Sequence, residues 1–533
     1  MTRLLARIAP PLFAACLTLI IAHAALGQEE QATPGLQQAF NGSLNYINRW
    51  IFWALFFDVS FGLANRPMPV IVVWFGLGAV FFTVFHGFKT IRGFGHSLKV
   101  VLGRYHDDDD HGEIHAFRAL TSALSATVGL GNIAGVAVAM VTGGPGALFW
   151  MMVLGFFGMA SKFHETTLSQ LFRTTNPDGS ISGGPMYVLD QGFKRHLPAL
   201  WPLGKLLAIV FAVFCMLASL GGGNMFQSNQ AFEGFFTTFV PVAMHETNGL
   251  RFLLSVGFGL TMAVIVAVVV LGGITRIGAA TSRLVPFMAA IYVLACLFIV
   301  IANIDMLPAL IGQVLGDAFG ADAAFGGLIG AMMVGFQRAA FSSEAGVGSS
   351  AIAHAAAKTK EPVREGFVAS LEPFVDTVVI CFMTGMVVLI TGAYQDAEGG
   401  AAVTLYAFKQ VSVTSSWFPY ILSVSIILFA FSTMIAWCYY GERAAGYLAG
   451  QQYAKYGVFA FRLVFVACVF IGSVAGLGPV IDLADAGLLS MAFPNILGGL
   501  LLAPLVGKMA NDYWRRLKRG DFEHESEPDP RAD

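Results

Sequence analysis

Long apolar stretches recur along almost the whole chain of 533 residues. A helix needs about 20 mainly apolar residues to cross the hydrocarbon core of a bilayer. Outer-membrane barrels instead show alternating segments of about ten residues, which this chain lacks. The pattern therefore predicts an all-α polytopic membrane protein. We expect 11 transmembrane helices, at residues 67–88, 113–141, 146–172, 205–234, 251–272, 278–302, 324–355, 363–391, 416–440, 458–477 and 484–507.

The composition excludes several other classes of protein. Only 12% of the residues are charged, whereas soluble proteins carry about 25%. The formal charge of −2 excludes a protein that binds nucleic acid by electrostatic attraction. All six cysteines lie inside apolar stretches without paired spacing, which argues against a disulfide framework and a metal cluster. We expect no organic cofactor and no obligate protein partner besides the lipid bilayer.

The chain divides into six predicted segments. Two arginines, an apolar centre and small residues are typical of a secretory signal peptide at the N-terminus, although an uncleaved first helix would have the same centre. Aromatic residues around Arg49 and Asp58 favour a helix lying at the membrane surface. In order, the segments are a signal peptide (1–27), a periplasmic or interfacial segment (28–65), an extra first helix with a basic loop (66–111), two five-helix repeats (112–303 and 304–507) and a tail (508–533).

Lysine and arginine residues indicate the orientation. If alternate loops are taken as cytoplasmic, they collect 23 of the 31 basic residues, with Lys162 and Arg364 among them. Cytoplasmic loops of membrane proteins carry an excess of lysine and arginine. The distribution therefore predicts that the C-terminus is cytoplasmic.

Two segments are predicted to be interrupted helices. Residues 123–135 and 336–350 place glycine and hydroxyl residues at mid-membrane depth, and the second adds an arginine and a glutamate. Interrupted backbone is tolerated there where it lines a cavity. Freed carbonyls can then bind a cation, and the next half-helix presents N–H groups to a carboxylate. Packing of small residues is the alternative, which Gly131 and Gly135 fit, but it does not explain the charged residues.

The positions of the two breaks suggest an internal repeat. They fall in the second and seventh predicted spans, so that two sets of five spans follow the extra first helix, each opening with a broken helix. An odd number of spans per set gives the two sets opposite orientations. This predicts the 5+5 inverted repeat with two discontinuous helices that secondary transporters use, with the binding site near the midplane.

Six motifs stand out in and beyond the two breaks: TVGLGNIAGVA (127–137), GGPG (143–146), GGPMY (183–187), GNMFQSN (223–229), FSSEAGVGS (341–349) and AIAHAAAKT (351–359). They closely resemble motifs of the alanine/glycine:cation symporter family. The similarity covers residues 65–510 in order and implies sodium-driven, sometimes proton-driven, uptake of alanine or glycine through the bacterial inner membrane. Residues 128–132 are also similar to the first core helix of the bacterial leucine transporter, which supports the five-plus-five fold.

The resemblance also implies a sodium site. Its ligands would be the backbone carbonyls of Ser125, Val128 and Phe429 and the hydroxyls of Ser432 and Thr433. These are hard oxygen ligands, as an alkali cation requires. From the residues alone, the two hydroxyls could equally bond back to their own helix.

The substrate is expected between the breaks. Its carboxylate would meet N–H groups near Gly129 and Gly131, and its ammonium would meet carbonyls around Ser342 and Gln227. An interhelical hydrogen bond is the alternative for Gln227, and simple packing is the alternative for the aromatic residues. The expected substrate-binding residues are Thr127, Gly129, Gly131, Asn132, Gln227, Phe336, Ser342, Ser343, Gly346 and Trp437.

The sequence departs from the family pattern in both breaks. The family commonly has glycine where Ala126 stands, and asparagine where Ser343 stands. A hydroxyl in place of an amide changes the donors and acceptors that a substrate meets. The choice among small amino acids is therefore left open.

Other charged residues fall inside the predicted spans, where they usually pair and mark function. Arg338 and Glu344 lie six positions apart across the second break and are expected to form a gating or structural pair. Four more residues could carry protons or serve the structure: His164, Glu165, Glu372 and Asp376.

Sodium symport has three alternatives: proton coupling, a channel and an enzyme. Proton coupling would use Glu344 or Asp376 as the carrier. A channel is disfavoured because no repeated filter sequence is present. An enzyme is disfavoured because the sequence shows no set of nucleophile, base and orienting residue.

Overall fold

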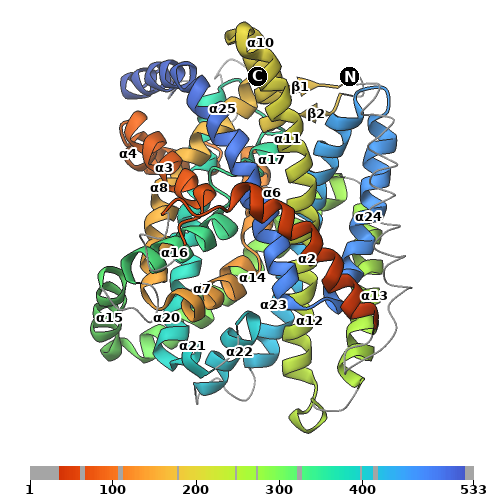
Figure 1. The fold of residues 1–533 in the computed structure, drawn as a ribbon. Coiled ribbons are helices and arrows are strands. Elements are labelled where there is room, and N and C mark those ends of the chain that lie inside the picture. The colour runs from red at the N-terminus through yellow and green to blue at the C-terminus, as the bar shows by residue number, and fades with distance from the viewer. Residues whose placement is uncertain are drawn as a thin grey trace, which may run out of the picture.

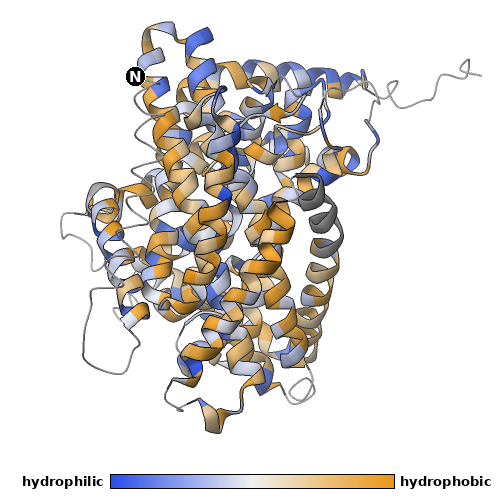
Figure 2. Ribbon diagram, turned by 90° about the vertical axis from the view of Figure 1, so that its right-hand side faces the viewer, coloured by the Kyte–Doolittle hydropathy of each residue, from blue (hydrophilic) through white to orange (hydrophobic). Residues whose placement is uncertain are grey.

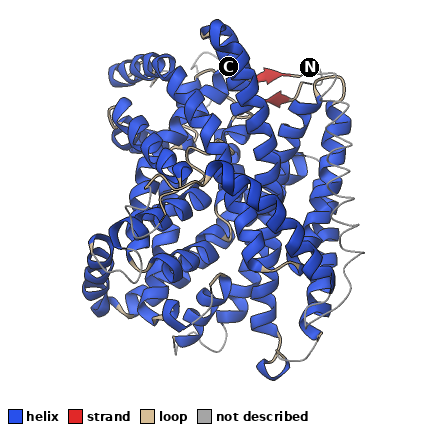
Figure 3. Cartoon of the chain, viewed as in Figure 1, coloured by secondary structure: helices blue, strands red, loops and turns tan. Residues whose placement is uncertain are grey.

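The computed structural model describes residues 35–60, 67–105, 112–176, 179–245, 249–271, 274–320, 327–396, 399–411 and 418–522. Helices account for nearly all of these residues (Figure 3). The strands β1 (Thr174–Thr175) and β2 (Ile181–Ser182) form one short antiparallel hairpin. The predicted signal peptide and the end of the predicted tail lie outside the described residues. The predicted all-α class is confirmed for the part of the chain that the structure describes.

The helices are labelled in chain order in Figure 1. Those before residue 250 are α2 (Gly35–Leu55), α3 (Val70–Phe85), α4 (Lys89–Arg92), α5 (Phe94–Val101), α6 (Ala116–Thr127), η1 (Gly131–Gly135), α7 (Val136–Gly143), α8 (Gly146–Leu171), α9 (Pro185–Tyr187), η2 (Val188–Gly192), α10 (Phe193–His196), η3 (Pro198–Leu200), α11 (Trp201–Leu220), η4 (Gly221–Met225), α12 (Phe226–Phe239) and η5 (Val242–Met244). The later ones are α13 (Leu250–Val270), α14 (Ile274–Ala302), η6 (Ile304–Met306), α15 (Leu307–Phe319), α16 (Gly327–Ser343), α17 (Ala351–His354), α18 (Pro362–Ala369), α19 (Leu371–Pro373), η8 (Phe374–Cys381), α20 (Phe382–Thr391), α21 (Ala393–Asp396), α22 (Ala401–Gln410), α23 (Phe418–Ala449), α24 (Ala454–Val474) and α25 (Leu477–Arg519).

The protein is a multi-pass membrane protein. Within the described ranges, eight helical segments are long and apolar enough to cross a membrane, and a ninth is the pair α6 and η1–α7, bent by 50° at the first break. α3 and α16 have only 16 and 17 residues. The count of eleven spans and the inverted repeat therefore stay predictions. The eight segments are Gly146–Leu171, Pro198–Phe239, Leu250–Val270, Val285–Ala302, Pro362–Thr391, Phe418–Ala449, Ala454–Val474 and Leu477–Arg519.

The long helices pack around α8, α11, α23 and α25. α25 lies along α11 and also contacts α3 and α8, while α8 packs against α16 and α18. α25 has 43 residues and continues to Arg519, beyond the predicted end of the last span at residue 507. Its extension consists largely of strong helix formers and ends in basic residues, which favour a helix C-terminus.

The two ends of the molecule differ in polarity. α10, the β1–β2 hairpin and the C-terminal end of the described chain gather at one end, drawn at the top of Figure 1. Figure 2 shows hydrophobic residues along the long helices and hydrophilic ones concentrated at that upper end. α10 carries Lys194 and Arg195 there, and the last turn of α25 carries Arg516, Lys518 and Arg519. These basic residues thus lie at one end of the molecule, and the side of the membrane that this end faces stays a prediction.

Candidate functional site

Side chains bind the backbone amides that the first break frees. Residues 128–130 separate α6 from the π-helical turn η1. The amide of Gly129 donates to Asn132 Oδ1 at 3.1 Å, and the amide of Leu130 donates to Gln227 Oε1 at 3.2 Å. The amides expected to meet a substrate carboxylate are thus engaged by two neutral side chains. The interhelical hydrogen bond that was the alternative role for Gln227 is present.

Four of the five predicted sodium ligands lie together where α6 meets α23. Thr433 Oγ1 donates to Ser125 O at 3.1 Å, and Ser125 Oγ donates to Ser432 O at 2.9 Å. Ser432 Oγ donates to Phe429 O at 3.0 Å within its own helix, which is the alternative that the sequence left open. Val128, the fifth, is the C-cap of α6. Buried carbonyl and hydroxyl oxygens from two helices therefore converge at the first break.

Two glycines allow α23 and α16 to approach the first break closely. A Cβ atom on Gly129 would collide with Thr433 Oγ1, so any larger residue would push α23 away from the break. A Cβ atom on Gly131 would lie 3.1 Å from the ring of Phe341, at the end of α16. The first break is therefore packed against both the sodium-site helix and the helix that leads into the second break.

The second break is held by charged side chains. Between α16 and α17, Glu344 has φ 55°, and Gly346 and Gly348 have φ 86° and 92°. A glutamate in the left-handed region is strained and persists only where its surroundings hold it. The indole Nε1 of Trp437 donates to Glu344 Oε1 at 3.0 Å, and the hydroxyl of Ser349 donates to Glu344 Oε2. Trp437 is thus placed at the second break.

Asp376 bridges the two breaks, a role that the sequence analysis missed. Its Oδ1 accepts a hydrogen bond of 2.6 Å from Asn132 Nδ2, and its Oδ2 accepts one from the hydroxyl of Ser342 and one of 3.0 Å from Thr377 Oγ1. The carboxylate is fully buried. Among the described residues no basic side chain forms an ion pair with it. The signal available in the sequence was a carboxylate deep in an apolar span, four positions after Glu372.

The remaining predicted substrate residues lie around this cluster or apart from it. The hydroxyls of Thr127 and Ser343 bond back to carbonyls of their own helices, at 3.4 and 3.0 Å. Phe336 lies apart, because its ring packs against Gly76 of α3 and against Trp150 of α8, with a centroid distance of 6.1 Å to the latter. The structure thus does not bring Phe336 to the other residues of the set.

The predicted pair between Arg338 and Glu344 is wrong. The guanidinium of Arg338 binds Asp485 of α25 instead, and Gln337 Nε2 donates to the same carboxylate at 2.7 Å. Both charged side chains are about 5% exposed. The reason is that α25 passes beside α16 and offers a nearer carboxylate, whereas the backbone at the break turns Glu344 toward Trp437.

A second buried ion cluster lies beside α17. Lys162 of α8 pairs with Glu372 at 2.9 Å, and its ammonium also donates to the hydroxyl of Ser350. His354 binds Glu372 and, at 2.6 Å, Glu365. Lys162 was counted with the basic residues of the cytoplasmic loops, but it lies inside α8 and is fully buried. The sequence could not show its pairing, because its two partners, Ser350 and Glu372, come from a distant part of the chain.

The site has the chemistry of a binding site for small charged solutes. Neutral oxygens converge at the first break, a carboxylate joins the two breaks, and ion pairs flank the second break. Within the described ranges, no group of three or more histidine, cysteine, aspartate or glutamate side chains is arranged to hold a metal ion. The five cysteines that the structure describes are free and buried. An alkali cation bound by carbonyls and hydroxyls is the kind of ion that this donor set fits.

Known proteins resemble the chain over most of its length. The sodium/alanine symporter AgcS of Methanococcus maripaludis is 40% identical over 442 residues, which cover 82% of this chain and 92% of AgcS. YrbD of Bacillus subtilis is named as a candidate sodium/proton-dependent alanine carrier protein. It is 32% identical, and the matched region covers 87% of this chain and 93% of YrbD. The crystal structure of MhsT in complex with L-phenylalanine matches 74% of this chain and 98% of MhsT, with 12% identity and a TM-score of 0.43.

The family model for the sodium:alanine symporter family matches residues 57–527. This range contains both breaks, the oxygen cluster at α23 and the ion pairs described above. Members of the family are transporters and not enzymes, and the family resemblance read from the sequence is confirmed. The chain belongs to the sodium:alanine symporter family.

Proposed function

We propose that the protein is a secondary active symporter that takes up alanine or glycine together with sodium through the bacterial inner membrane, with its C-terminus in the cytoplasm. The family and the name of AgcS support an amino acid and sodium as the transported solutes. The observation that carries the proposal is the oxygen cluster formed by Ser125, Ser432 and Thr433 between the first break and α23.

Sodium would bind by replacing hydrogen bonds inside this cluster. The hydroxyl proton of Thr433 now points to Ser125 O. A sodium ion between these oxygens would be bound by both, because each offers a lone pair to a hard cation. The ion would thereby tie α23 to the first break and fix the geometry that the substrate meets. This link between ion binding and substrate binding is what a symporter requires.

The amino acid would bind between the breaks beside Asp376. Its carboxylate would compete with Asn132 and Gln227 for the amides of Gly129 and Leu130. Its ammonium would face the carboxylate of Asp376, a buried negative charge without a basic partner in the described chain. Phe341 packs at Gly131 and Trp437 lies at the second break, and these bulky aromatic side chains would restrict the substrate to a small side chain such as that of alanine or glycine.

One sodium ion per substrate supplies enough free energy. Moving one charge through 100 mV is worth about 2.3 kcal/mol, and a tenfold sodium gradient adds about 1.4 kcal/mol. The total of roughly 3.7 kcal/mol corresponds to about 500-fold accumulation of a neutral amino acid.

The test is uptake of labelled alanine and glycine into proteoliposomes with and without an inward sodium gradient. The variant Ser432→Ala/Thr433→Ala removes both hydroxyls of the cluster and is expected to lose sodium-dependent uptake. Ser425→Ala is the matched control, because this hydroxyl of the same helix bonds back to Ile421 O at 2.8 Å, away from the break. Uptake that ignores sodium, or a double variant that behaves like the control, would reject the proposal.

Proton coupling is the second candidate, favoured by Asp376. A carboxylate that joins both breaks could carry a proton instead of facing a cation. YrbD, whose name includes protons, is among the relatives of this chain. Uptake that continues without sodium and collapses when a protonophore is added would support this alternative.

A further inference from the structure

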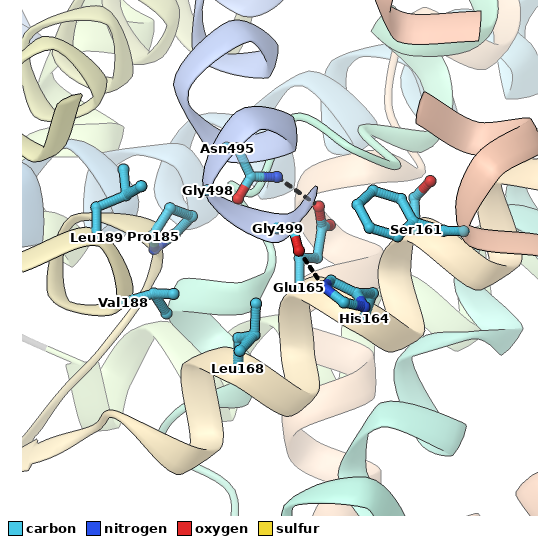
Figure 4. Close-up of a pocket in the computed structure, with 11 residues that line it drawn as sticks. Ser161, His164, Glu165, Leu168, Pro185, Val188, Leu189, Asn495, Gly498 and Gly499 are labelled. Atoms are coloured by element: carbon cyan, nitrogen blue, oxygen red, sulfur yellow. Dashed lines mark hydrogen bonds between the residues drawn. The ribbon is translucent and has the colours of Figure 1, made fainter. Parts of the chain in front are cut away.

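A small cavity lies between α8, α25 and the α9–η2 segment, close to the second break (Figure 4). It leaves about 10 Å³ for the centre of a water-sized sphere, which is room for about one water molecule. Apolar residues such as Phe82 and Leu168 form part of its lining. Its polar lining residues are Ser161, His164, Glu165 and Asn495.

Glu165 connects this cavity to the second break. Its Oε2 accepts hydrogen bonds from the amide of Gly346 at 3.1 Å and from Asn495 Nδ2 at 2.8 Å. Asn495 also donates to Gly346 O at 2.9 Å, so the three residues form a closed triangle. The side chain of Glu165 lines the cavity, and no donor among the described residues binds its Oε1, although this atom is buried.

The charged neighbours of Glu165 are committed elsewhere. Lys162, one turn before it on α8, binds Glu372 and Ser350. His164 Nε2 must donate to Gly499 O at 3.0 Å, because a carbonyl only accepts, so its neutral Nδ1 accepts from His86 at 2.9 Å. Five titratable groups face Glu165 from α8 and from the elements packed on it: Lys162, His164, His86, Glu344 and Glu372. None of them forms a bond with Oε1.

A buried carboxylate oxygen without a donor is expensive in free energy while the group is ionised. A proton on Oε1 removes the charge and turns this atom into a donor, while Oε2 still accepts from Gly346 and Asn495. Neutral acceptors make weaker hydrogen bonds than carboxylates do. Protonation at the cavity would therefore loosen the hold of Glu165 on the second break.

We propose that this cavity is a proton-binding site, in which Glu165 takes up a proton at Oε1 from a hydronium ion, releases water, and returns the proton to water later in the transport cycle. The site is separate from the sodium cluster at α23 and from Asp376. The protonated form frees the second break to move, so that acid accelerates turnover. The inference rests on the proposed transport function only for its effect on turnover, and not for the binding of the proton itself.

The first experiment measures sodium-driven alanine uptake by the full-length protein in proteoliposomes between pH 6 and pH 8, values that bracket neutrality. Glu165→Gln mimics the protonated side chain, and we expect the uptake rate of this variant to be independent of pH. The wild-type rate should rise by about tenfold at acid pH, which corresponds to the free energy of one charge-assisted hydrogen bond. Glu233→Gln is the control, since this carboxylate pairs with Arg251 at 2.5 Å and lies partly exposed. A Glu165→Gln profile identical to that of wild type overturns the inference.

A second measurement keeps the inference testable without transport. Infrared difference spectra of the purified full chain, recorded across the same pH range, should show the C=O band of a carboxylic acid that titrates in wild type and is missing in Glu165→Gln. If neither alanine nor glycine is taken up, the proposed function fails. Identical infrared spectra for wild type and Glu165→Gln would instead overturn the proton site. Should Glu165→Gln not fold, Glu165→Asp must move the midpoint of the titration, and an unchanged midpoint overturns the inference.

Discussion

The two breaks solve the same structural problem with different chemistry. At the first break, the freed amides of Gly129 and Leu130 are bound by neutral amide side chains, Asn132 and Gln227. At the second break, the carboxylate of Glu344 binds side chains, and that of Glu165 binds the backbone. Interrupted backbone must be satisfied in either case, because no water reaches it in hydrocarbon.

The different chemistry of the two breaks suits them to respond to different signals. Neutral amides and hydroxyls do not titrate near neutral pH, so the first break is suited to sense a cation through its oxygens. Carboxylates change charge with protonation and with the arrival of a counter-ion, so the second break is suited to respond to charge. Asp376 joins the two, because Asn132 comes from the first break and Ser342 from the end of α16.

Removing one partner of the buried ion cluster at the second break should give the largest effect. Glu372→Gln leaves Lys162 buried without a counter-charge and should lower the free energy of unfolding by about 3–5 kcal/mol. Thermal unfolding of the detergent-solubilised protein measures this. Glu361→Gln is the control, because its partner Arg516 is about 30% exposed and such pairs contribute at most about 1 kcal/mol. Equal thermal stability of Glu372→Gln and Glu361→Gln would show that the buried ion cluster does not stabilise the second break.

Neutralising the bridge between the breaks should weaken substrate binding. Asp376→Asn keeps the shape and an acceptor for Ser342 but removes the negative charge that would face the ammonium of the amino acid. The alanine concentration for half-maximal uptake should therefore rise by roughly 10–100-fold, as expected for the loss of about 1.5–3 kcal/mol. Asp317→Asn serves as the comparison, since that carboxylate binds the amide of Gly146, at 2.7 Å. An unchanged alanine dependence in Asp376→Asn would mean that this charge does not hold the substrate.

Adding one methyl group tests the close approach at the first break. Gly129→Ala should collide with Thr433 Oγ1 and cost about 1–3 kcal/mol, with a matching loss of sodium-dependent uptake. Gly135→Ala, only six residues away, meets no atom within 4 Å and should be neutral or slightly stabilising, because alanine favours a helix. Parallel thermal unfolding and uptake assays check both variants, and equal behaviour would remove the argument for Gly129.

A partly exposed ion pair gives the smallest expected effect. Burial acts to raise the pKa of Asp190, but hydrogen bonds from Lys205, Trp201 and Tyr447 hold that pKa below its usual value. The pair therefore stabilises the protein above the pKa of an unfolded aspartate, about 3.9, and this contribution is lost as the pH falls through the lower, folded-state pKa. Asp190→Asn should cost under about 1 kcal/mol at neutral pH, and less in acid. A pH-independent difference in thermal unfolding would contradict this assignment.

Much of the fold and part of the site could be predicted from the sequence. Apolar length gave the membrane class, and the glycine-rich runs marked both breaks, since few other patterns interrupt an apolar helix. The predicted sodium ligands Ser125 and Thr433 lie within hydrogen-bond distance, although they are 308 positions apart. The roles of all the predicted substrate and sodium residues stay predictions.

The partners of buried charges could not be predicted. Arg338 was expected to pair along its own segment, yet it binds Asp485, 147 positions away. Lys162 was counted with the cytoplasmic loops, yet it is buried against Glu372. A local pattern shows that a charge lies in an apolar span, but it does not show which helix will pass beside it.

The sequence by itself determined that this chain crosses a membrane repeatedly, breaks two of its helices with glycine, and belongs with sodium and amino-acid carriers. The first two properties follow from local composition and spacing, and the third follows from the motifs that resemble the family. The chain carries all of these in any conformation. Only the tertiary structure decided that Asp376 joins the breaks, that Glu165 holds Gly346 beside a cavity, and that Trp437 restrains Glu344. The reason is that each of these bonds joins residues from different helices, and helix packing alone decides which polar groups are close enough to satisfy one another in hydrocarbon.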